Sequence, residues 1–254
     1  MKYAIIGVEG PQDQAFVKKV LKLLKFKSFD GKESNLDNFW RKLIPRYPKK
    51  GNLYKRLDMP SIAFTETHSV AIYAGEGSNL TTNLDDILLN HTEYQTALTA
   101  FGVIADADKE SPAEVTQNYS NYLKEHFSNF PDKPGMINSA STRTGIYILP
   151  DNKNSGVLDT LLCSCGEIAY PEFWERATSY LDRFSDDERK SLKWKPFARE
   201  KALVATVVSV LKPGKTNTAS LADNNWVSQE TRAKVSELNQ FVKFIEDLLE
   251  LNAN

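Results

Sequence analysis

Residues 3–10, Tyr-Ala-Ile-Ile-Gly-Val-Glu-Gly, form a short apolar run that ends in an acid and a glycine. A run of this length, rich in Ile and followed by Pro11, is typical of a strand buried on both faces of a parallel sheet. Apolar residues at helical spacing follow within residues 16–24, which predicts a turn into a helix. Glu9 would then project from the carboxyl end of a strand, where open α/β sheets build their sites. The same position also suits an acid that caps the helix or pairs with a nearby lysine.

Three further uncharged apolar runs predict three more strands, at residues 70–74, 100–105 and 145–149. Each is followed by a turn and a helical pattern, and this alternation favours a parallel sheet. We therefore expect an α/β core over residues 1–165, with a mostly parallel four-stranded sheet flanked by helices.

The remainder of the chain has helical patterns near residues 171–184, 196–211 and 228–251. The last pattern carries one stripe of apolar side chains, which is typical of core packing rather than of a cofactor site. We expect residues 166–254 to form a C-terminal helical region packed on the core.

The composition is that of an ordinary globular protein, with 254 residues and 41% hydrophobic content. No apolar span is long enough for a membrane helix and no charged-then-apolar leader is present, so we expect a cytoplasmic protein without a membrane partner. The two cysteines, Cys163 and Cys165, are too few for a structural zinc site and are interpreted as packing residues.

The third predicted strand ends in Asp106-Ala-Asp108. Two acids at positions i and i+2 on extended backbone point the same way, and carboxyl ends of parallel strands share one edge with Glu9. Crowded carboxylates repel one another and lose hydration, so such a cluster requires a cation. Hard oxygen ligands suit Mg²⁺ or Mn²⁺. Taken alone, an Asp-x-Asp pair is also a common turn former.

Two later acids are further candidates for the same edge. Asp151 follows the fourth predicted strand, and Asp159 falls in the first turn of the next predicted helix. Asp159 either faces the cluster or simply stabilises the helix terminus, where the dipole favours an acid.

Positive charge is concentrated near the start of the chain, where residues 1–60 hold 14 Lys or Arg against 6 Asp or Glu. Residues 41–56 contain no acid, and two tyrosines and two prolines are interleaved among the basic residues. Such a segment suits a nucleic-acid backbone, although it could equally be a solvated surface loop. The candidate nucleic-acid-binding residues are Arg41, Lys42, Arg46, Lys49, Lys50, Lys55 and Arg56.

Two glycine-containing patterns predict turns and no nucleotide site. Gly75-x-Gly77 lacks the third glycine of a dinucleotide fingerprint, and residues 213–216 follow a helical pattern rather than a strand. Lys201 lies in a later helical pattern and is interpreted as a surface lysine, although it could reach a phosphate near the acids.

The order of these motifs resembles the TOPRIM domain shared by topoisomerases, bacterial primases and OLD-type nucleases. More narrowly, four short motifs resemble a group of uncharacterised bacterial TOPRIM-like proteins related to the OLD nucleases. They are Val-Glu-Gly-Pro-x-Asp at 8–13, Ile-Ala-Asp-Ala-Asp at 104–108, Leu-Pro-Asp-Asn at 149–152 and Gly-Val-Leu-Asp at 156–159. The resemblance covers roughly residues 1–165.

By this resemblance, Glu9 would be a general base or acid and a metal ligand, while Asp106 and Asp108 would hold Mg²⁺. Asp13 belongs to the first of the resembling motifs, and Glu110 stands where many members carry a third aspartate, so both are additional candidate acids.

The chain also departs from the family pattern. The basic insertion at about 28–65 is longer than a minimal TOPRIM domain needs, and the later acid is Asp159 rather than a glutamate.

The leading prediction for function is Mg²⁺- or Mn²⁺-dependent phosphodiester cleavage in DNA or RNA. One alternative is a nucleic-acid-binding module that keeps the fold without turnover. Another is a phosphotransfer enzyme that acts on small nucleotides.

Overall fold

The structure is a computed structural model that describes residues 1–44 and 59–251. One mixed sheet runs through it in the strand order β2-β3-β4-β1-β5-β7-β6. The four central strands are parallel and are β1 (Lys2–Val8), β4 (His68–Ala74), β5 (Ala100–Asp106) and β7 (Arg143–Leu149). They coincide with the four predicted apolar runs and confirm an α/β fold with a parallel core.

The sheet has seven strands, so the prediction of four was wrong. The three additional strands pair antiparallel at the edges and are β2 (Lys27–Ser28), β3 (Ser61–Phe64) and β6 (Ile137–Asn138). Two of them have two residues each, which is too short to show any periodic pattern. β3 lies inside the segment that was interpreted as a basic insertion, so that segment contributes to the sheet.

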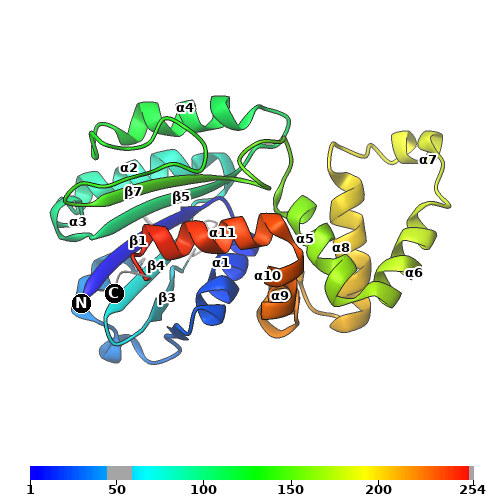
Figure 1. Ribbon diagram of the computed structural model, residues 1–254, viewed down its shortest axis with the longest axis horizontal. Helices are drawn as coiled ribbons and strands as arrows, with labels where there is room; N and C mark the ends of the chain where they lie inside the picture. The colour runs from blue at the N-terminus through cyan, green and yellow to red at the C-terminus, as the bar shows by residue number, and fades with distance from the viewer. Residues whose placement is uncertain (45–58, 252–254) are drawn as a thin grey trace, which may run out of the picture.

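Helices cover both faces of the sheet, as Figure 1 shows. Alternate strand residues face opposite layers: Ile6 belongs to the core beneath α1 and α11, and Ile5 belongs to the core beneath α2 and α4. The helices on these faces are α1 (Pro11–Leu23), α2 (Leu80–Asn90), α3 (Glu93–Ala97), α4 (Pro112–Leu123) and α11 (Ser236–Leu248). Short 3₁₀ turns are η1 (Glu33–Asn35), η2 (Asn38–Leu43) and η4 (Gly77–Asn79).

The last helix packs closely against the sheet because two strand positions are glycine. A Cβ atom at Gly102 would lie 2.6 Å from Cδ2 of Leu248, and one at Gly145 would lie 3.0 Å from its Cδ1. Glycine at both positions therefore lets α11 approach β5 and β7.

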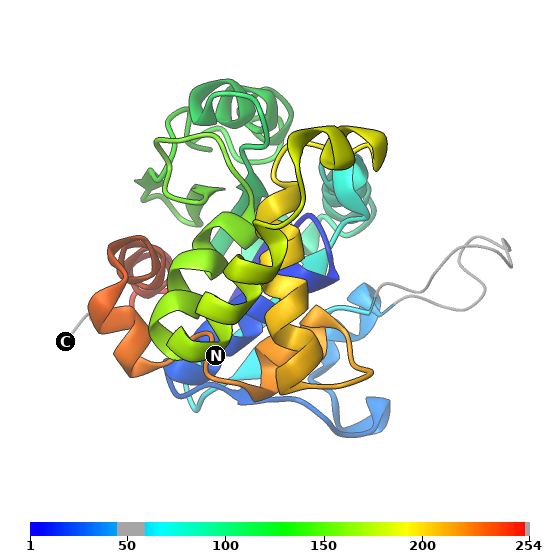
Figure 2. The ribbon, with the colours of Figure 1, turned by 90° about the vertical axis from the view of Figure 1, so that its right-hand side faces the viewer.

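Six further helices follow β7, and the first four of them form the end at the right of Figure 1 that faces the viewer in Figure 2. They are α5 (Leu158–Ala169), α6 (Pro171–Leu181), α7 (Asp186–Ser191), α8 (Ala198–Leu211), α9 (Asn217–Asp223) and α10 (Gln229–Lys234). The single helix predicted over residues 228–251 is two helices, because Val235 is extended (φ −107°, ψ 106°).

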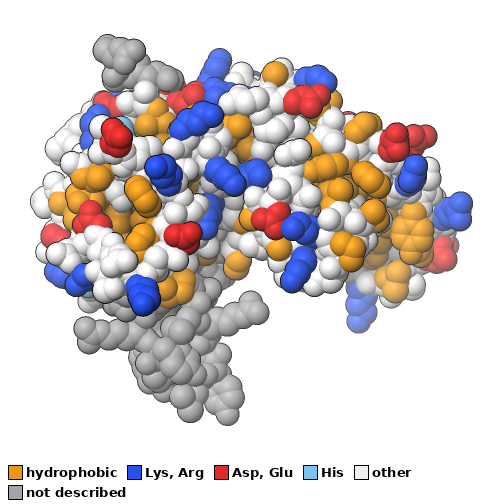
Figure 3. Space-filling model, turned by 90° about the horizontal axis from the view of Figure 1, so that it is seen from below, with side chains coloured by type: hydrophobic (Ala, Val, Ile, Leu, Met, Phe, Trp, Pro, Cys, Tyr) orange, Lys and Arg blue, Asp and Glu red, His pale blue; other side chains and the backbone are white. Residues whose placement is uncertain are grey.

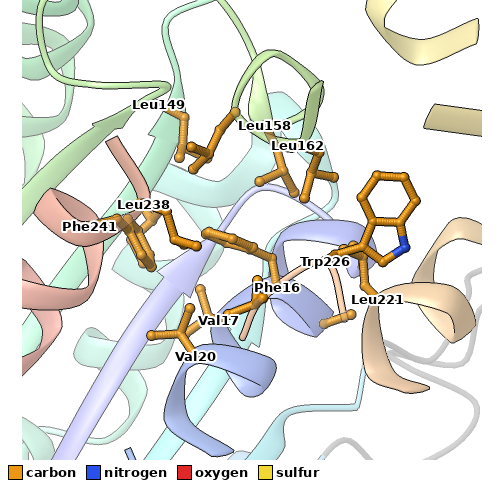
Figure 4. Close-up of a cluster of buried hydrophobic side chains, with 14 of the residues drawn as sticks. Phe16, Val17, Val20, Leu149, Leu158, Leu162, Leu221, Trp226, Leu238 and Phe241 are labelled. Carbon is orange, nitrogen blue, oxygen red and sulfur yellow. The ribbon is translucent and has the colours of Figure 1, made fainter. Parts of the chain in front are cut away.

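The helical region shares its core with the sheet. Figure 4 shows Phe16 of α1 and Phe241 of α11 close to Leu158 and Leu162 of α5, with Trp226 beside them. α5 runs across residue 165, so the proposed domain division at that residue stays a prediction.

The surface carries charges of both signs. On the face drawn in Figure 3, Lys and Arg side chains gather over the middle of the molecule, and apolar side chains are exposed toward the helical end. No helix within the described part of the chain is long and apolar enough to cross a membrane.

Candidate active site

Glu9 and Asp106 lie at the carboxyl ends of two neighbouring strands. β1 pairs in parallel with β5, with Val8 opposite Ile104, so both acids emerge from the same edge of the sheet. The backbone amide of Asp106 donates a hydrogen bond of 3.2 Å to Oε1 of Glu9. The sheet register therefore brings together the acids that follow the first and the third predicted strands.

The side chain of Asp106, the last residue of β5, contacts the first turn of α5. Its Oδ1 accepts a hydrogen bond of 2.8 Å from the backbone amide of Leu158, where the helix dipole favours negative charge. The turn after β5 is tied to the same place, because Asp108 and Gly156 exchange two backbone hydrogen bonds of 2.8 and 2.9 Å. Asp108 itself is exposed and has left-handed backbone, with φ of 50°.

Asp13 and Asp159 stand at the starts of two helices beside this pair. Oδ2 of Asp13 accepts a hydrogen bond of 2.9 Å from the amide of Gly10 at the start of α1. Asp159 is buried in the first turn of α5 and accepts a hydrogen bond of 3.1 Å from Nε2 of Gln12. The two acids thus combine a local structural role with a place next to Glu9 and Asp106.

Burial and mutual repulsion perturb the protonation of these acids. Burial, followed by the negative charge of Asp13, raises the pKa of Glu9 to about 7. Burial, followed by the charges of Asp13 and Glu9, holds the pKa of Asp106 well above its usual range. Asp108 adds to the repulsion on both. Burial likewise raises the pKa values of Asp13 and Asp159. The structure therefore brings Glu9, Asp106 and Asp108 together, with Asp13 and Asp159 beside them.

Two residues that were not predicted as site residues complete this surrounding. Tyr119 of α4 is buried beside the acids, and burial, followed by the charges of Glu9, Asp106 and Asp13, raises its pKa. The positive charge of Lys201 on α8 acts on Glu9, Asp13 and Asp159 and offsets part of the rise in their pKa values. Periodicity marks Tyr119 only as a core residue. Lys201 was interpreted as a surface lysine that could reach a phosphate near the acids, and no local pattern indicates its effect on the acids themselves.

A pocket of about 720 Å³ opens next to the acids. It lies between the turn after β5 and the connection from α7 to α8, which turns back toward the sheet in Figure 1. Asp108 and Lys201 line it, so the pocket adjoins the acid cluster. Glu110 also lines the pocket and is exposed.

Asp151 has a different place. Its Oδ1 accepts hydrogen bonds from the backbone amides of Lys153 and Asn154, at 2.9 and 2.8 Å, in the turn after β7. This arrangement is that of a turn-forming aspartate. Asp151 makes no hydrogen bond to the other candidate acids in the described part of the chain.

The basic segment is described only in part. Arg41 and Lys42 lie on η2, where Arg41 donates to the carbonyl oxygen of Ser34 and Lys42 pairs with Glu93. The remaining candidates, Arg46, Lys49, Lys50, Lys55 and Arg56, fall within residues 45–58, outside the described residues.

η2 itself lies at the far end of β1 from the acids. Phe39 of η2 stacks on Tyr3, with ring centroids 3.9 Å apart, whereas Glu9 follows the other end of that strand. A strand rises about 3.3 Å per residue, so the seven residues of β1 separate the two places by about 20 Å.

A family comparison matches residues 3–250 to the family described as "Protein of unknown function (DUF3226)". The chain belongs to this DUF3226 family. The match extends over the acids, the pocket and the helical region, so all of these are parts of one family unit. A comparison with curated proteins gives no match.

Solved structures resemble this DUF3226 chain at low sequence identity. The hypothetical protein PH0156 from Pyrococcus horikoshii OT3 is 15% identical, with a TM-score of 0.55 and coverage of 100% of both chains. This likeness supports the fold alone. The C-terminal region of the Xanthomonas campestris pv. campestris OLD protein, in a structure phased with mercury, is 13% identical with a TM-score of 0.42 over 99% of this chain and 98% of that one.

The spacing of the acids bears on whether they could hold a divalent cation. Within residues 1–44 and 59–251, no group of three or more His, Cys, Asp or Glu is spaced to hold a metal ion. Mg²⁺, however, usually keeps several waters and is bound through one or two carboxylates plus substrate phosphates. Asp106 and Asp108 are two such carboxylates. Among the described residues, Lys201 supplies a positive charge that acts on the neighbouring Glu9. A cation shared with a substrate phosphate would therefore not need a third carboxylate from this DUF3226 chain.

Proposed function

We propose that this chain is a Mg²⁺- or Mn²⁺-dependent nuclease that cleaves phosphodiester bonds in nucleic acid. The observation that carries the proposal is the crowding of Glu9, Asp106 and Asp108 at one sheet edge, where burial and repulsion raise the pKa values of Glu9 and Asp106. Strongly perturbed acids of this kind, next to a pocket, are characteristic of active sites. The resemblance of the sequence motifs to TOPRIM domains supports the same chemistry.

In this proposal, Asp106 and Asp108 would hold the cation. When bound, it would withdraw charge from the phosphate and stabilise the negative charge of the leaving oxygen. The hydrogen bond from the amide of Leu158 orients the Asp106 carboxylate, and the hydrogen bond from the amide of Asp106 orients Glu9. Both acids are therefore positioned before substrate arrives.

Glu9 is the group suited to move a proton. With a pKa of about 7, its carboxyl group is partly protonated at neutral pH and can accept or donate a proton during cleavage. Lys201 supplies a positive charge between the acids and the pocket, where the phosphate of a substrate would lie. The negative charge of a phosphate at that position would be attracted by Lys201, the same lysine that offsets part of the pKa rise of the acids.

A second candidate function is phosphate chemistry on small nucleotides. The pocket volume of about 720 Å³ favours it, because sites for small ligands typically measure about 300–1,000 Å³. Such an enzyme would not need the basic segment at residues 41–56, whereas a nuclease would use it.

The test is incubation of the full chain with single- and double-stranded DNA and RNA, and separately with nucleoside triphosphates, in Mg²⁺ or Mn²⁺. A nuclease cuts polymers, loses activity in EDTA, and loses it with Asp106→Asn. The matched control is Asp151→Asn, which alters an acid at the end of β7 that only forms a turn and should leave cleavage intact. Metal-dependent turnover of the triphosphates alone would support the second candidate, and binding without any turnover would contradict both.

A further inference from the structure

The lining of the pocket beside the acids is rich in lysine. Four of its lining residues are lysines, against two acids. The lysines are all exposed, and none takes part in an ion pair found within the described ranges of the chain. They are Lys109, Lys193, Lys195 and Lys201. The pocket therefore carries surplus positive charge that suits an anionic ligand.

The same lining also contains apolar and aromatic side chains. Trp194 and Phe197 are both half-buried there, and Leu192 is 62% exposed. The guanidinium of Arg189 lies 5.6 Å from the ring centroid of Trp194 and braces the ring. Arg189 is in turn held by a hydrogen bond of 3.0 Å to the carbonyl oxygen of Leu181. An aromatic ring braced in this way offers a flat stacking surface.

Left-handed backbone is concentrated around the same pocket. Asp108, Lys193 and Phe197 have positive φ values of 50°, 56° and 60°. Non-glycine residues adopt this conformation at a conformational cost, and such residues cluster at ligand sites where the surrounding structure holds them. Lys193 and Phe197 lie before and after Trp194 in the chain, so the left-handed backbone shapes the segment that carries this tryptophan.

We propose that this pocket binds one nucleotide unit, with the base stacked on Trp194 and Phe197 and its phosphates against the lysines. A nucleotide matches both the lysines and the aromatic residues of the lining, because it combines an aromatic base with an adjacent anionic group. Asp108 and Lys201 belong to the pocket and the acid cluster alike, so a strand held here would lead into the acids. The proposal rests on the proposed function for its substrate class, and the unit could come from a strand or from a free nucleotide.

The test is a binding titration in EDTA, so that it does not depend on cleavage. The chain has four tryptophans, and three of them, Trp40, Trp174 and Trp226, are at most 6% exposed. Intrinsic fluorescence quenched by a ligand therefore reports on Trp194. The probes are an oligothymidylate of eight residues and thymidine 5′-monophosphate. Both should quench the fluorescence of the wild-type protein. Tighter binding of the oligonucleotide identifies a strand as the ligand, and equal binding identifies a free nucleotide.

Trp194→Ala should abolish the quench and weaken binding, measured by anisotropy of a labelled probe, by about 5- to 150-fold. Trp194→Phe keeps a stacking surface and should restore most of the affinity. The control Tyr122→Ala removes an aromatic side chain that is 61% exposed on α4, outside the pocket, and should bind as the wild type does. Equal circular dichroism spectra and melting temperatures confirm that each variant is folded.

The role of the lysines is tested separately with a double variant, Lys193→Ala with Lys195→Ala. The control is Lys243→Ala on α11. The double variant should make the log-log salt dependence of oligonucleotide binding shallower by about 0.7 per lost phosphate contact. Unchanged affinity in both Trp194→Ala and the double lysine variant overturns the pocket assignment. If both the wild type and Trp194→Ala cleave nucleic acid with the same KM, the pocket assignment is overturned and the nuclease proposal is kept. Quenching without any metal-dependent cleavage supports the pocket and removes the nuclease.

Discussion

The amide nitrogen of Asp106 donates a hydrogen bond of 3.2 Å to Oε1 of Glu9, although the two residues are 97 positions apart in the sequence. The contact exists because β1 and β5 are neighbours in the sheet and end at the same edge. It joins the backbone of one acid to the side chain of the other, so the fold itself fixes their proximity. Burial, followed by the charge of Asp13, raises the pKa of each acid. The charge of Glu9 adds to the rise at Asp106, whereas the hydrogen bond from the Asp106 amide opposes the rise at Glu9.

The first prediction concerns the pH dependence of stability without metal. The pKa of Glu9 is raised from its ordinary value of 4.5 to about 7 in the folded chain. Between these values the folded state keeps a proton that the unfolded state has lost, so the free energy of unfolding falls as the pH rises. The contribution is complete below about pH 4.5 and is lost above about pH 7.

Glu9→Gln should flatten this fall, as measured by urea denaturation in EDTA at several pH values from 5 to 7.5. Glu110→Gln, which alters an exposed acid of the pocket, should keep the wild-type slope. A Glu9→Gln protein whose stability changes with pH as steeply as that of the wild type would show that Glu9 is not perturbed in this way.

The second prediction concerns Lys201, whose charge acts on three of the acids. Lys201→Ala should lower the melting temperature in EDTA because the acids lose a compensating charge. If Lys201 contacts the phosphate, cleavage should also fall by something of the order of 10²-fold, as for the loss of other charge-stabilising donors. Lys215→Ala, an exposed lysine after α8, is the control. Wild-type behaviour of Lys201→Ala in both measurements would return it to an ordinary surface lysine.

The central strands could be predicted because a strand buried on both faces must be an uncharged apolar run, as in residues 100–105. The edge strands could not, because edge position and brevity remove that requirement. Ser61–Phe64, second from the edge, shows the effect of brevity, since its four residues lie within the segment that was interpreted as a basic insertion. The break at Val235 was missed for a related reason: the apolar stripe continues across it.

The acids Glu9, Asp106 and Asp108 could be predicted because strand ends share an edge, and this needs only the strand order to be nearly right. Tyr119 and Lys201 come from helices whose approach to that edge depends on packing far along the chain. No local pattern encodes such packing. The described part of the basic segment likewise lies at the opposite end of β1 from the acids, which spacing along the sequence could not indicate.

The third prediction concerns the basic segment at residues 41–56. If it follows a phosphate backbone, replacing Lys49, Lys50, Lys55 and Arg56 with Ala should weaken binding to nucleic acid. The log-log salt slope should become shallower by about 0.7 to 0.9 per lost contact. Changing Lys42, which already pairs with Glu93, should have a smaller effect. An unchanged slope in the fourfold variant would mean that the segment is a solvated loop.

The last prediction follows from the repulsion at the sheet edge. Burial and the charges of Asp13 and Glu9 hold the pKa of the Asp106 carboxyl well above its usual range, which costs stability at neutral pH. Asp106→Asn replaces this carboxyl with a neutral amide, so in EDTA the variant should melt above the wild type. Each kcal/mol of relieved repulsion corresponds to about 2–4 °C for a chain of this size. With millimolar Mg²⁺ or Mn²⁺, the wild type should gain stability by mass action and the variant should gain little.

The most direct test of a cation-dependent acidic site is therefore the melting temperature of wild type and Asp106→Asn, measured across a titration of Mg²⁺ and of Mn²⁺. Asp151→Asn serves as the control and should respond to metal as the wild type does. We predict that the curves of the wild type and Asp106→Asn cross, with the variant more stable in EDTA and the wild type more stable in metal. A wild type whose melting temperature ignores both metals, with Asp106→Asn no more stable than it in EDTA, would contradict the site and the nuclease built on it.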